Sequence, residues 1–215
     1  MEGLNVEEDN LYIKKIILGE LSTNCYIVGC NKTKEAMIID PAIESDIILN
    51  QIKDNSFKLK YIVNSHGHWD HIAGNKMLKE RFSAELMIHS FDAEMLLKPE
   101  KNLSLFAGNP IQSPPTDIFL EDGFHFKLGY LDLLIIHTPG HTPGSISIKI
   151  NKKVFTGDTL FANGIGRTDL PGGSMREIKH SIKDKLVVLD PICEIFPGHG
   201  PGSTIGEEIK NNPWL

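Results

Sequence analysis

The first half of the chain alternates short hydrophobic runs with clearly amphipathic segments. Runs rich in β-branched residues at 11–19, 23–29 and 36–40 are separated by turn residues, which predicts three strands. Residues 44–55 (ESDIILNQIKDN) carry apolar side chains at helical spacing, which predicts an amphipathic helix. The same patterns then predict strands at 60–64 and 85–89, and helices at 71–82 and 91–98.

The second half begins with a long polar segment. Residues 99–117 are rich in Pro, Asn and Ser and have no clear periodicity, so we expect a surface connection there. A meander of strands is predicted next, at 124–128, 131–137, 145–150 and 153–157. The chain closes with a helix, a strand with its turn, and a last helix, predicted at 175–189, 193–200 and 204–212. Runs of strands interrupted by helices in both halves predict a layered α/β arrangement with mixed sheets.

Length and composition suit one folded domain, which we expect to span residues 1–215. With 40% hydrophobic and 23% charged residues, the chain can bury a substantial core. The formal net charge is −6 at pH 7 and no Lys/Arg run exceeds two residues. A nucleic-acid-binding surface usually shows as a basic patch, so we expect no nucleic-acid partner.

The sequence shows no membrane or export segment. The N-terminal stretch MEGLNVEEDN is acidic and lacks the basic start and apolar run of a secretory signal. The longest apolar run, LLII at 133–136, is far short of the roughly 18 residues that span a bilayer. We therefore expect a cytoplasmic protein that does not bind membranes. We expect reduced thiols at Cys25, Cys30 and Cys193, and we interpret Cys25 and Cys193, which lie in apolar strand-like runs, as small buried hydrophobic residues.

Residues 65–71 read SHGHWDH, which places three histidines and an aspartate within seven positions. A solvated polar loop is one interpretation, and a convergent site is the other. Three more polar clusters follow strand-like runs, and each combines glycine with one His or Asp: TPGHTPG (138–144), TGDT (156–159) and FPGHG (196–200). Glycine permits sharp turns at strand ends, where sites of α/β proteins form, so all four segments can reach one pocket.

Together the four segments supply five imidazoles and two carboxylates: His66, His68, Asp70, His71, His141, Asp158 and His199. One tetrahedral zinc with an open position needs three protein ligands, so seven suit two metals better. His66 and His68 point to one side of an extended turn and can bind one metal, whereas Asp70 and His71 can turn to a second. Asp158 suits a bridging role because a carboxylate has two oxygens. We interpret the remaining histidines as structural: His89, His125, His137 and His180.

These motifs resemble those of the metallo-β-lactamase superfamily. SHGHWDH is similar to that family's histidine-rich signature, with Ser65 where threonine is usual. HTPGHTPGS, FTGDTLF and FPGHG match its later motifs in the same order, so the resemblance covers nearly the whole chain. It implies an α/β fold in the form of a four-layer αββα sandwich with two mixed β-sheets and the metals in a cleft at one edge.

The resemblance also implies a ligand assignment. The first metal would be bound by His66, His68 and His141, and the second by Asp70, His71 and His199, with Asp158 bridging them. The implied cofactors are two divalent metal ions, of which Zn²⁺ is expected and iron or manganese is compatible with the same donors. Asp40, in MIIDPA, stands where the family has an aspartate that orients the metal-binding histidines from behind.

Within the superfamily, GIGRTDLPGGS (164–174) and GHGPGSTIGEE with the ending NNPWL are most similar to the compact glyoxalase II group, the hydroxyacylglutathione hydrolases. This implies a small-molecule thioester substrate such as an S-(2-hydroxyacyl)-thiol (S-lactoylglutathione-like), cleaved by a metal-bridging hydroxide that the catalytic Asp70 orients. Long glyoxalase II carries a C-terminal helical glutathione-binding domain, and the sequence to Leu215 shows none. We therefore assign no glutathione contacts and leave the thiol carrier open.

Arg167 and Asp169, in the glycine-flanked GRTDLPGG, are candidate substrate contacts. They could line the entrance and pair with a carboxylate or a thiol-bearing ligand, or they could form an ion pair that only braces the loop. A thiolate leaving group departs without a strong general acid, whereas the amine from a β-lactam or peptide needs a proton. The ligand clusters contain no spare acidic side chain, which favours the thioester.

Two other functions remain open from the sequence. Persulfide dioxygenases share HxHxDH and a GRTD stretch but use one iron, and His66, His141 and Asp158 would form the 2-His-1-carboxylate set of oxygen-activating iron. LPGG after GRTD favours the hydrolase over this mononuclear-iron persulfide dioxygenase. A non-enzymatic metal-binding or partner-binding module is the third class. The oligomeric state is not predicted.

Overall fold

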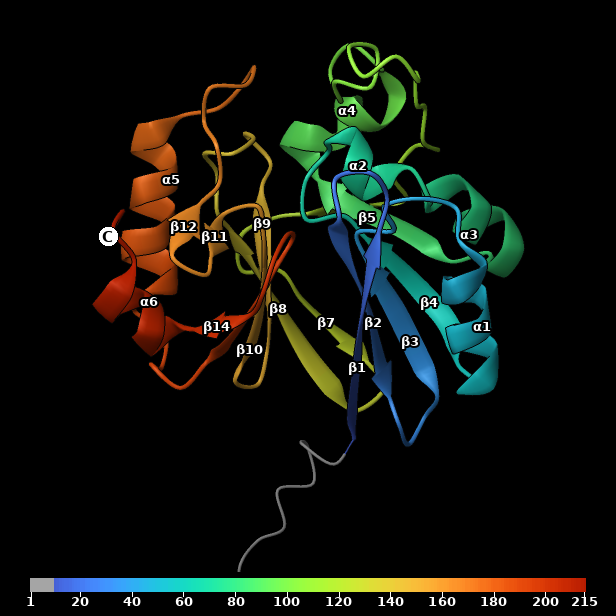
Figure 1. Cartoon of the computed structure of the whole chain (residues 1–215). Helices are drawn as coiled ribbons and strands as arrows, with labels where there is room; N and C mark the ends of the chain where they lie inside the picture. The colour runs from blue at the N-terminus through green and yellow to red at the C-terminus, as the bar shows by residue number, and fades with distance from the viewer. Residues whose placement is uncertain (1–9) are drawn as a thin grey trace, which may run out of the picture.

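Two β-sheets lie face to face at the centre of the molecule, and helices cover the outer face of each (Figure 1). The computed structural model describes residues 10–215, so the prediction about a secretory signal concerns residues that lie largely outside the described range. Helices α1 and α3 cover one sheet, and α5 and α6 cover the other. The arrangement is a four-layer αββα sandwich, which confirms the predicted fold class.

The first sheet contains the N-terminal strands. Its first three strands are antiparallel neighbours, and the next three continue in parallel, so the sheet is mixed. Across the sheet the strands are β1 (Leu11–Leu18), β2 (Thr23–Cys30), β3 (Glu35–Ile39), β4 (Lys58–Val63), β5 (Glu85–His89) and β6 (Ile118–Leu120).

The second sheet comes from the C-terminal half and is also mixed. Only β10 and β13 pair in parallel, and the other neighbours are antiparallel. In spatial order the strands are β14 (Ser203–Thr204), β13 (Glu194–Pro197), β10 (Lys153–Gly157), β9 (Ile146–Ile150), β8 (Leu131–His137) and β7 (His125–Leu128). A small hairpin, β11 (Leu160–Phe161) and β12 (Gly164–Ile165), follows β10.

Alternation along the central strands produces three apolar layers between the four structural layers. In β2, Cys25 and Ile27 face the helices, whereas Tyr26 and Val28 face the opposite sheet, as the period of two for a strand requires. A third layer, which includes Ile178, packs the second sheet against α5 and α6. Both faces of both sheets are therefore covered, which explains why the strands read as nearly continuous apolar runs.

The helices agree with the predicted segments in place but not always in length. They are α1 (Asp46–Asp54), α2 (Trp69–Ile72), α3 (Asn75–Phe82), α4 (Ala93–Leu97), α5 (Met175–Ser181) and α6 (Ile205–Asn211). A 3₁₀ turn, η1 (Ser90–Asp92), precedes α4, and a π-helical turn, η2 (Ile182–Leu186), continues α5.

The predicted helix at 71–82 is divided in the structure at Gly74. The amide of Gly74 donates to the carbonyl of Pro41 at 2.6 Å, and a Cβ atom there would lie 2.5 Å from the carbonyl oxygen of Ile43. This close backbone contact ends α2 and lets α3 begin in a new direction. The sequence analysis also missed β6, whose three residues pair with β5. Among residues 10–215, no helix combines the length and apolar character needed to cross a bilayer.

Candidate metal centre

All four polar segments follow the carboxyl ends of strands and meet at one edge of the sandwich, beside α2 (Figure 1). Residues 65–71 follow β4 of the first sheet, whereas the other three segments follow β8, β10 and β13 of the second. An isolated β-bridge between Thr23 and His199 links the two sheets here. The seven predicted ligands therefore come together from both sheets.

Three histidines form the first cluster. Nδ1 of His68 lies 3.0 Å from Nε2 of His66 and 2.9 Å from Nε2 of His141. All three side chains are buried, and three imidazole nitrogens converge on one point. Nδ1 of His68 carries at most one proton, so it can donate a hydrogen bond to only one of the two neighbouring nitrogens. A cation at this point could instead accept a lone pair from each of the three nitrogens.

Asp70, His71 and His199 form the second cluster. Oδ2 of Asp70 lies 3.4 Å from Nε2 of His71 and 3.3 Å from Nε2 of His199. The two imidazole nitrogens are themselves 3.3 Å apart. A tetrahedral zinc with ligands at its usual bond lengths separates its ligand atoms by roughly 3.3 Å. The spacing and the donor types of this cluster therefore fit a divalent metal ion.

The carboxylate of Asp158 lies between the two clusters. Its Oδ2 is 3.7 Å from Nε2 of His141 and 3.6 Å from Nε2 of His199, and its Oδ1 is 3.7 Å from Nε2 of His71. Oδ1 is buried and has no hydrogen-bond partner. A buried carboxylate oxygen without a partner is costly, and a cation on each side of Asp158 would remove that cost.

The outer nitrogens of the histidines are held by groups behind them. Nδ1 of His141 lies 2.8 Å from the carbonyl oxygen of Arg167, and Nδ1 of His199 lies 3.0 Å from that of Leu21. A carbonyl can only accept, so each Nδ1 donates and each Nε2 presents a lone pair to the cluster. The rings are thus fixed in the orientation that metal binding requires.

Asp40 holds the loop that carries the first histidines. Its carboxylate accepts hydrogen bonds from the amide of Ser65 at 2.7 Å and from the hydroxyl of Ser65 at 2.6 Å. Oδ2 also lies 3.0 Å from Nδ1 of His71. Asp40 adopts a left-handed backbone conformation, with φ of 53°, which an aspartate tolerates better than most residues. The structure therefore places Asp40 behind the second cluster.

Burial and neighbouring charge set the protonation of the cluster. Burial, followed by the charges of His71 and His141, lowers the pKa of His66 well below its usual value. Burial and His141 lower the pKa of His68 to about 3. Burial raises the pKa of Asp70, but His71 and the other neighbouring imidazoles outweigh it and hold that pKa well below its usual range. His66 and His68 therefore stay neutral and Asp70 stays ionised, which are the forms that bind metal. Burial lowers the pKa of His71, but Asp70 and Asp40 outweigh it and raise that pKa well above its usual value, so metal binding there must displace a proton.

Asp92 is a buried residue that the sequence analysis missed. Its Oδ2 accepts hydrogen bonds from the amide of Gly67 at 3.0 Å and the hydroxyl of Thr142 at 2.6 Å, and its Oδ1 accepts from the amide of Gly144 at 2.7 Å. Gly67 lies between His66 and His68. Asp92 therefore joins the loop of the first two histidines to the loop of His141. Its partners lie 25 to 52 positions away, so no local pattern indicates this role.

The clusters open into a cavity of about 560 Å³. Arg167 and several of the metal-cluster residues line this cavity. The rest of its wall is apolar: Leu21, Trp69, Leu103, Phe161, Ile165 and Leu170. Arg167 and Asp169 form a two-point ion pair, with Nε to Oδ1 at 2.8 Å and Nη2 to Oδ2 at 2.7 Å. Both side chains are exposed, and only Arg167 lines the cavity.

The other singled-out side chains lie outside the clusters. The rings of His89 and His137 stack on each other, with centroids 4.0 Å apart, and His180 pairs with Asp184 on α5 and η2. The cysteines are free and buried, and burial raises the pKa of the Cys25 thiol strongly, as expected for an inert thiol.

Comparison with known proteins decides the family. The family model described as the metallo-beta-lactamase superfamily matches residues 18–199, a range that includes all seven cluster residues. This chain belongs to the metallo-beta-lactamase superfamily. The recognition made from the sequence motifs is thereby confirmed.

Two curated relatives show which branches of this superfamily the chain is similar to. It is 38% identical over 205 residues to hydroxyacylglutathione hydrolase GloC of Haemophilus influenzae, covering 89% of this chain and 92% of that protein. It is also 33% identical over 202 residues to the human mitochondrial persulfide dioxygenase ETHE1, covering 90% and 71%. The two relatives carry different activities, so sequence identity alone does not choose between them.

Two solved structures superpose on nearly the whole of this chain. BLEG-1 B3 metallo-beta-lactamase superposes with a TM-score of 0.90 at 35% identity, covering 95% of this chain and 99% of that one. TTHA1623, solved in a di-iron-bound form, superposes with a TM-score of 0.83 at 32% identity, covering 94% and 100%. A related chain of the same fold thus binds two metal ions.

Proposed function

We propose that this protein hydrolyses a thioester bond in a small molecule, such as an S-(2-hydroxyacyl)-thiol, and that it does so with two divalent metal ions, zinc being the expected ion. One observation carries the proposal: two three-residue ligand clusters lie side by side with the Asp158 carboxylate between them. A site for one metal does not need the second cluster. The similarity to GloC supports the choice of a thioester.

The chain's own residues prepare a water molecule for attack. Bound ions would lower the pKa of a water molecule between them and polarise the thioester carbonyl. Asp70 is ionised, and its Oδ2 accepts a hydrogen bond from the hydroxyl of Thr23 at 3.0 Å, which fixes the carboxylate. The proposed role of Asp70 is to accept a hydrogen bond from the attacking water and aim its lone pair at the carbonyl carbon.

The cavity wall suits an acyl-thiol substrate. Trp69, Leu103 and Phe161 give it an apolar surface against which an acyl group and a sulfur atom can pack. Apart from the cluster residues Asp70 and Asp158, no carboxylic acid is among the side chains that line it. A thiolate can leave without a proton donor, whereas an amine cannot, so this wall favours a thioester over a β-lactam or a peptide.

A second candidate function is the oxidation of a persulfide at a single iron, and the similarity to ETHE1 favours it. His66, His141 and Asp158 offer the 2-His-1-carboxylate donor set for such an iron. In that case Asp70, His71 and His199 would have no metal of their own. The two functions therefore differ in the number of metals as well as in the substrate.

The deciding experiment measures metal content and two activities on the same protein, purified without chelator or added metal. We expect about two equivalents of metal per chain, mostly zinc, and hydrolysis of S-lactoyl-thiols without oxygen consumption. Asp70→Asn should lower kcat about 10²-fold or more, whereas Asp54→Asn, an exposed aspartate at the end of α1, should have no effect. One equivalent of iron together with persulfide-dependent oxygen uptake would replace the proposal with the dioxygenase.

A further inference from the structure

The small hairpin β11–β12 begins and ends at the metal centre. It follows Asp158, and it precedes Arg167, whose carbonyl oxygen accepts the hydrogen bond from Nδ1 of His141 at 2.8 Å. The base of the hairpin is tightly packed: a Cβ atom on Gly166 would lie 1.8 Å from the carbonyl oxygen of Asp158 and 3.3 Å from Cβ of His141. A displacement of the hairpin would therefore reach residues of both clusters.

The same hairpin supplies part of the cavity wall. Phe161 and Ile165 line the cavity, and the ring centroid of Phe161 lies 6.4 Å from that of His199. Each strand of the hairpin has two residues, and a two-stranded hairpin is marginally stable at best on its own. Its position must therefore be set by contacts with other elements.

A buried glutamate on α6 holds the tip of the hairpin. Oε2 of Glu208 accepts hydrogen bonds from the amide of Asn163 and from Nδ2 of Asn212, both at 2.8 Å. Nδ2 of Asn212 also donates to the carbonyl oxygen of Gly164 at 3.0 Å, and the hydroxyl of Ser203 donates to Oε1 of Glu208. The side chains that hold the tip are buried, with Glu208 2% and Asn212 7% exposed.

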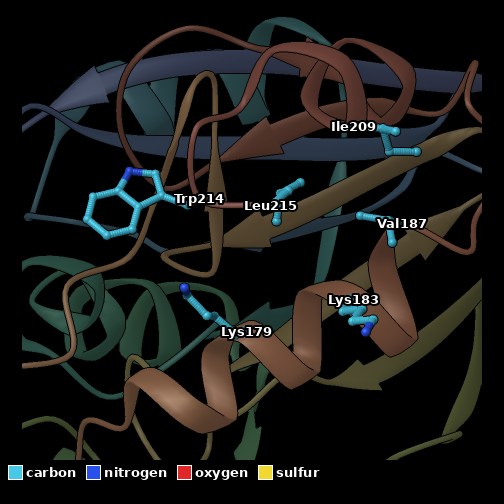
Figure 2. Close-up of a pocket in the computed structure, with 6 residues that line it drawn as sticks. All are labelled: Lys179, Lys183, Val187, Ile209, Trp214 and Leu215. Carbon is cyan, nitrogen blue, oxygen red and sulfur yellow. The ribbon is translucent and has the colours of Figure 1, made fainter.

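One side of α6 is thus committed to the hairpin. Glu208 lies in GHGPGSTIGEE, the segment that also supplies His199 to the second cluster. Asn212 lies four positions after Glu208, and residues at this spacing share one side of a helix. Ile209, the next residue, instead borders a cavity of about 510 Å³ between α6 and α5 (Figure 2). Glu207 is exposed.

We propose that Glu208 is a positioning residue for the metal centre. It fixes the tip of the hairpin, and the hairpin fixes the Arg167 carbonyl that orients His141 and the Phe161 side chain in the cavity wall. A carboxylate suits this position because its two oxygens accept from several donors at once. The effect on metal binding is independent of the reaction, whereas the effect on substrate binding rests on the proposed function.

Glu208→Gln is the test, because its amide group leaves at least one of the buried donors without an acceptor. The measurement is Zn²⁺ titration of the metal-free full chain in competition with a chromophoric chelator. We expect the affinity for at least one equivalent to fall about 3–10-fold, less than for a group bonded directly to a ligand, because Glu208 acts through the hairpin. Glu207→Gln changes the net charge equally and should keep the wild-type affinity. Wild-type Zn²⁺ affinity in Glu208→Gln would overturn the proposal.

Hydrogen exchange of residues 158–167 shows whether the hairpin transmits the effect. The amide of Asn163 loses its acceptor in Glu208→Gln, so we expect faster exchange there than in wild type or Glu207→Gln. Faster exchange with wild-type Zn²⁺ affinity would mean that Glu208 supports only the fold. Weaker Zn²⁺ binding with unchanged exchange would mean that the hairpin is not the route. Either result would overturn the proposal.

Asn212→Ala is the second variant, for use if Glu208→Gln does not fold. It removes the bond to Gly164 and keeps the bond between Glu208 and Asn163, so we expect smaller changes in the same direction. Wild-type exchange and Zn²⁺ affinity in this variant would also overturn the proposal.

Kinetics with a thioester substrate separate this inference from the proposed function. Glu208→Gln should raise KM about 2–5-fold, the value of roughly one buried methylene group, because the Phe161 wall moves. An unchanged KM would overturn the role of Glu208 in the cavity wall. If the wild-type protein hydrolyses no thioester, the proposed function fails, and the Zn²⁺ titration still decides whether Glu208 positions the metal centre.

Discussion

Oδ2 of Asp40 lies 3.0 Å from Nδ1 of His71, the ring nitrogen that faces away from the second metal cluster. The same carboxylate accepts two hydrogen bonds from Ser65, the residue that precedes His66. One side chain therefore orients an imidazole of the second cluster and fixes the start of the loop that carries the first. A side chain that hydrogen-bonds to a metal ligand both orients that ligand and raises the affinity for the metal.

Asp40→Asn should weaken metal binding about 10–100-fold, chiefly at the cluster that contains His71. The amide keeps the shape of the carboxylate but loses the negative charge that stabilises the imidazole. The measurement is metal retained per chain after dialysis against a graded series of chelator concentrations. Ser65→Ala keeps the contact between Asp40 and His71 and should lose less metal. Equal losses in both variants would show that the loop contact, not the imidazole contact, matters.

Asp92 provides the corresponding test for the first cluster. Asp92→Asn turns an amide group toward the donors of Gly67, Thr142 or Gly144, so at least one buried donor loses its acceptor. The free energy of unfolding in urea should fall by about 1–3 kcal/mol, and less metal should be retained. Asp132→Asn, at an exposed ion pair on β8, is the control and should change neither quantity. Reduced stability with wild-type metal retention would contradict a positioning role for Asp92.

Gly198 leaves no room for a side chain next to the Asp158 carboxylate. A Cβ atom there would lie 2.2 Å from Oδ1 of Asp158 and 2.9 Å from Cε1 of His71. Gly198→Ala must therefore displace Asp158 or His71, and we expect loss of at least one equivalent of metal by elemental analysis. Gly164→Ala is the matched control, because its Cβ would meet only Cβ of Phe161, at 3.8 Å. Full metal content in Gly198→Ala would place Asp158 outside the ligand set.

The convergence of the seven His and Asp side chains could be predicted because they lie in motifs that follow strand ends. Strand periodicity placed 131–137 and 153–157 correctly, and the turns after them had to bring His141 and Asp158 to the same edge. Other features depend on contacts between distant segments. The three-residue β6 exists only because β5 offers it an open edge, and α2 ends where Gly74 meets Pro41. Contacts of this kind cannot be predicted from the local sequence pattern.

Steady-state kinetics with a thioester substrate can distinguish the roles of Arg167 and Asp169. Arg167 lines the cavity and Asp169 does not, although the two are paired. If the guanidinium contacts substrate, Arg167→Gln should raise KM about 3–10-fold with little change in kcat, since it removes binding that the ground state and transition state share. Asp169→Asn frees the guanidinium and should not raise KM. A similar rise in both variants would mean that the pair only braces its loop.

His89 should make stability depend on pH in mildly acidic solution. Burial, followed by the neighbouring His137, lowers the pKa of His89 from 6.5 to about 4. The unfolded chain therefore binds more protons between these two values, so the free energy of unfolding rises with pH through this window and falls as the pH drops below 6.5. His89→Asn removes this contribution. Urea unfolding at about pH 7.5 and about pH 5 should show a loss of stability on acidification that is about 1–2 kcal/mol smaller in His89→Asn than in wild type. Identical losses in the two proteins would mean that His89 titrates normally in the folded state.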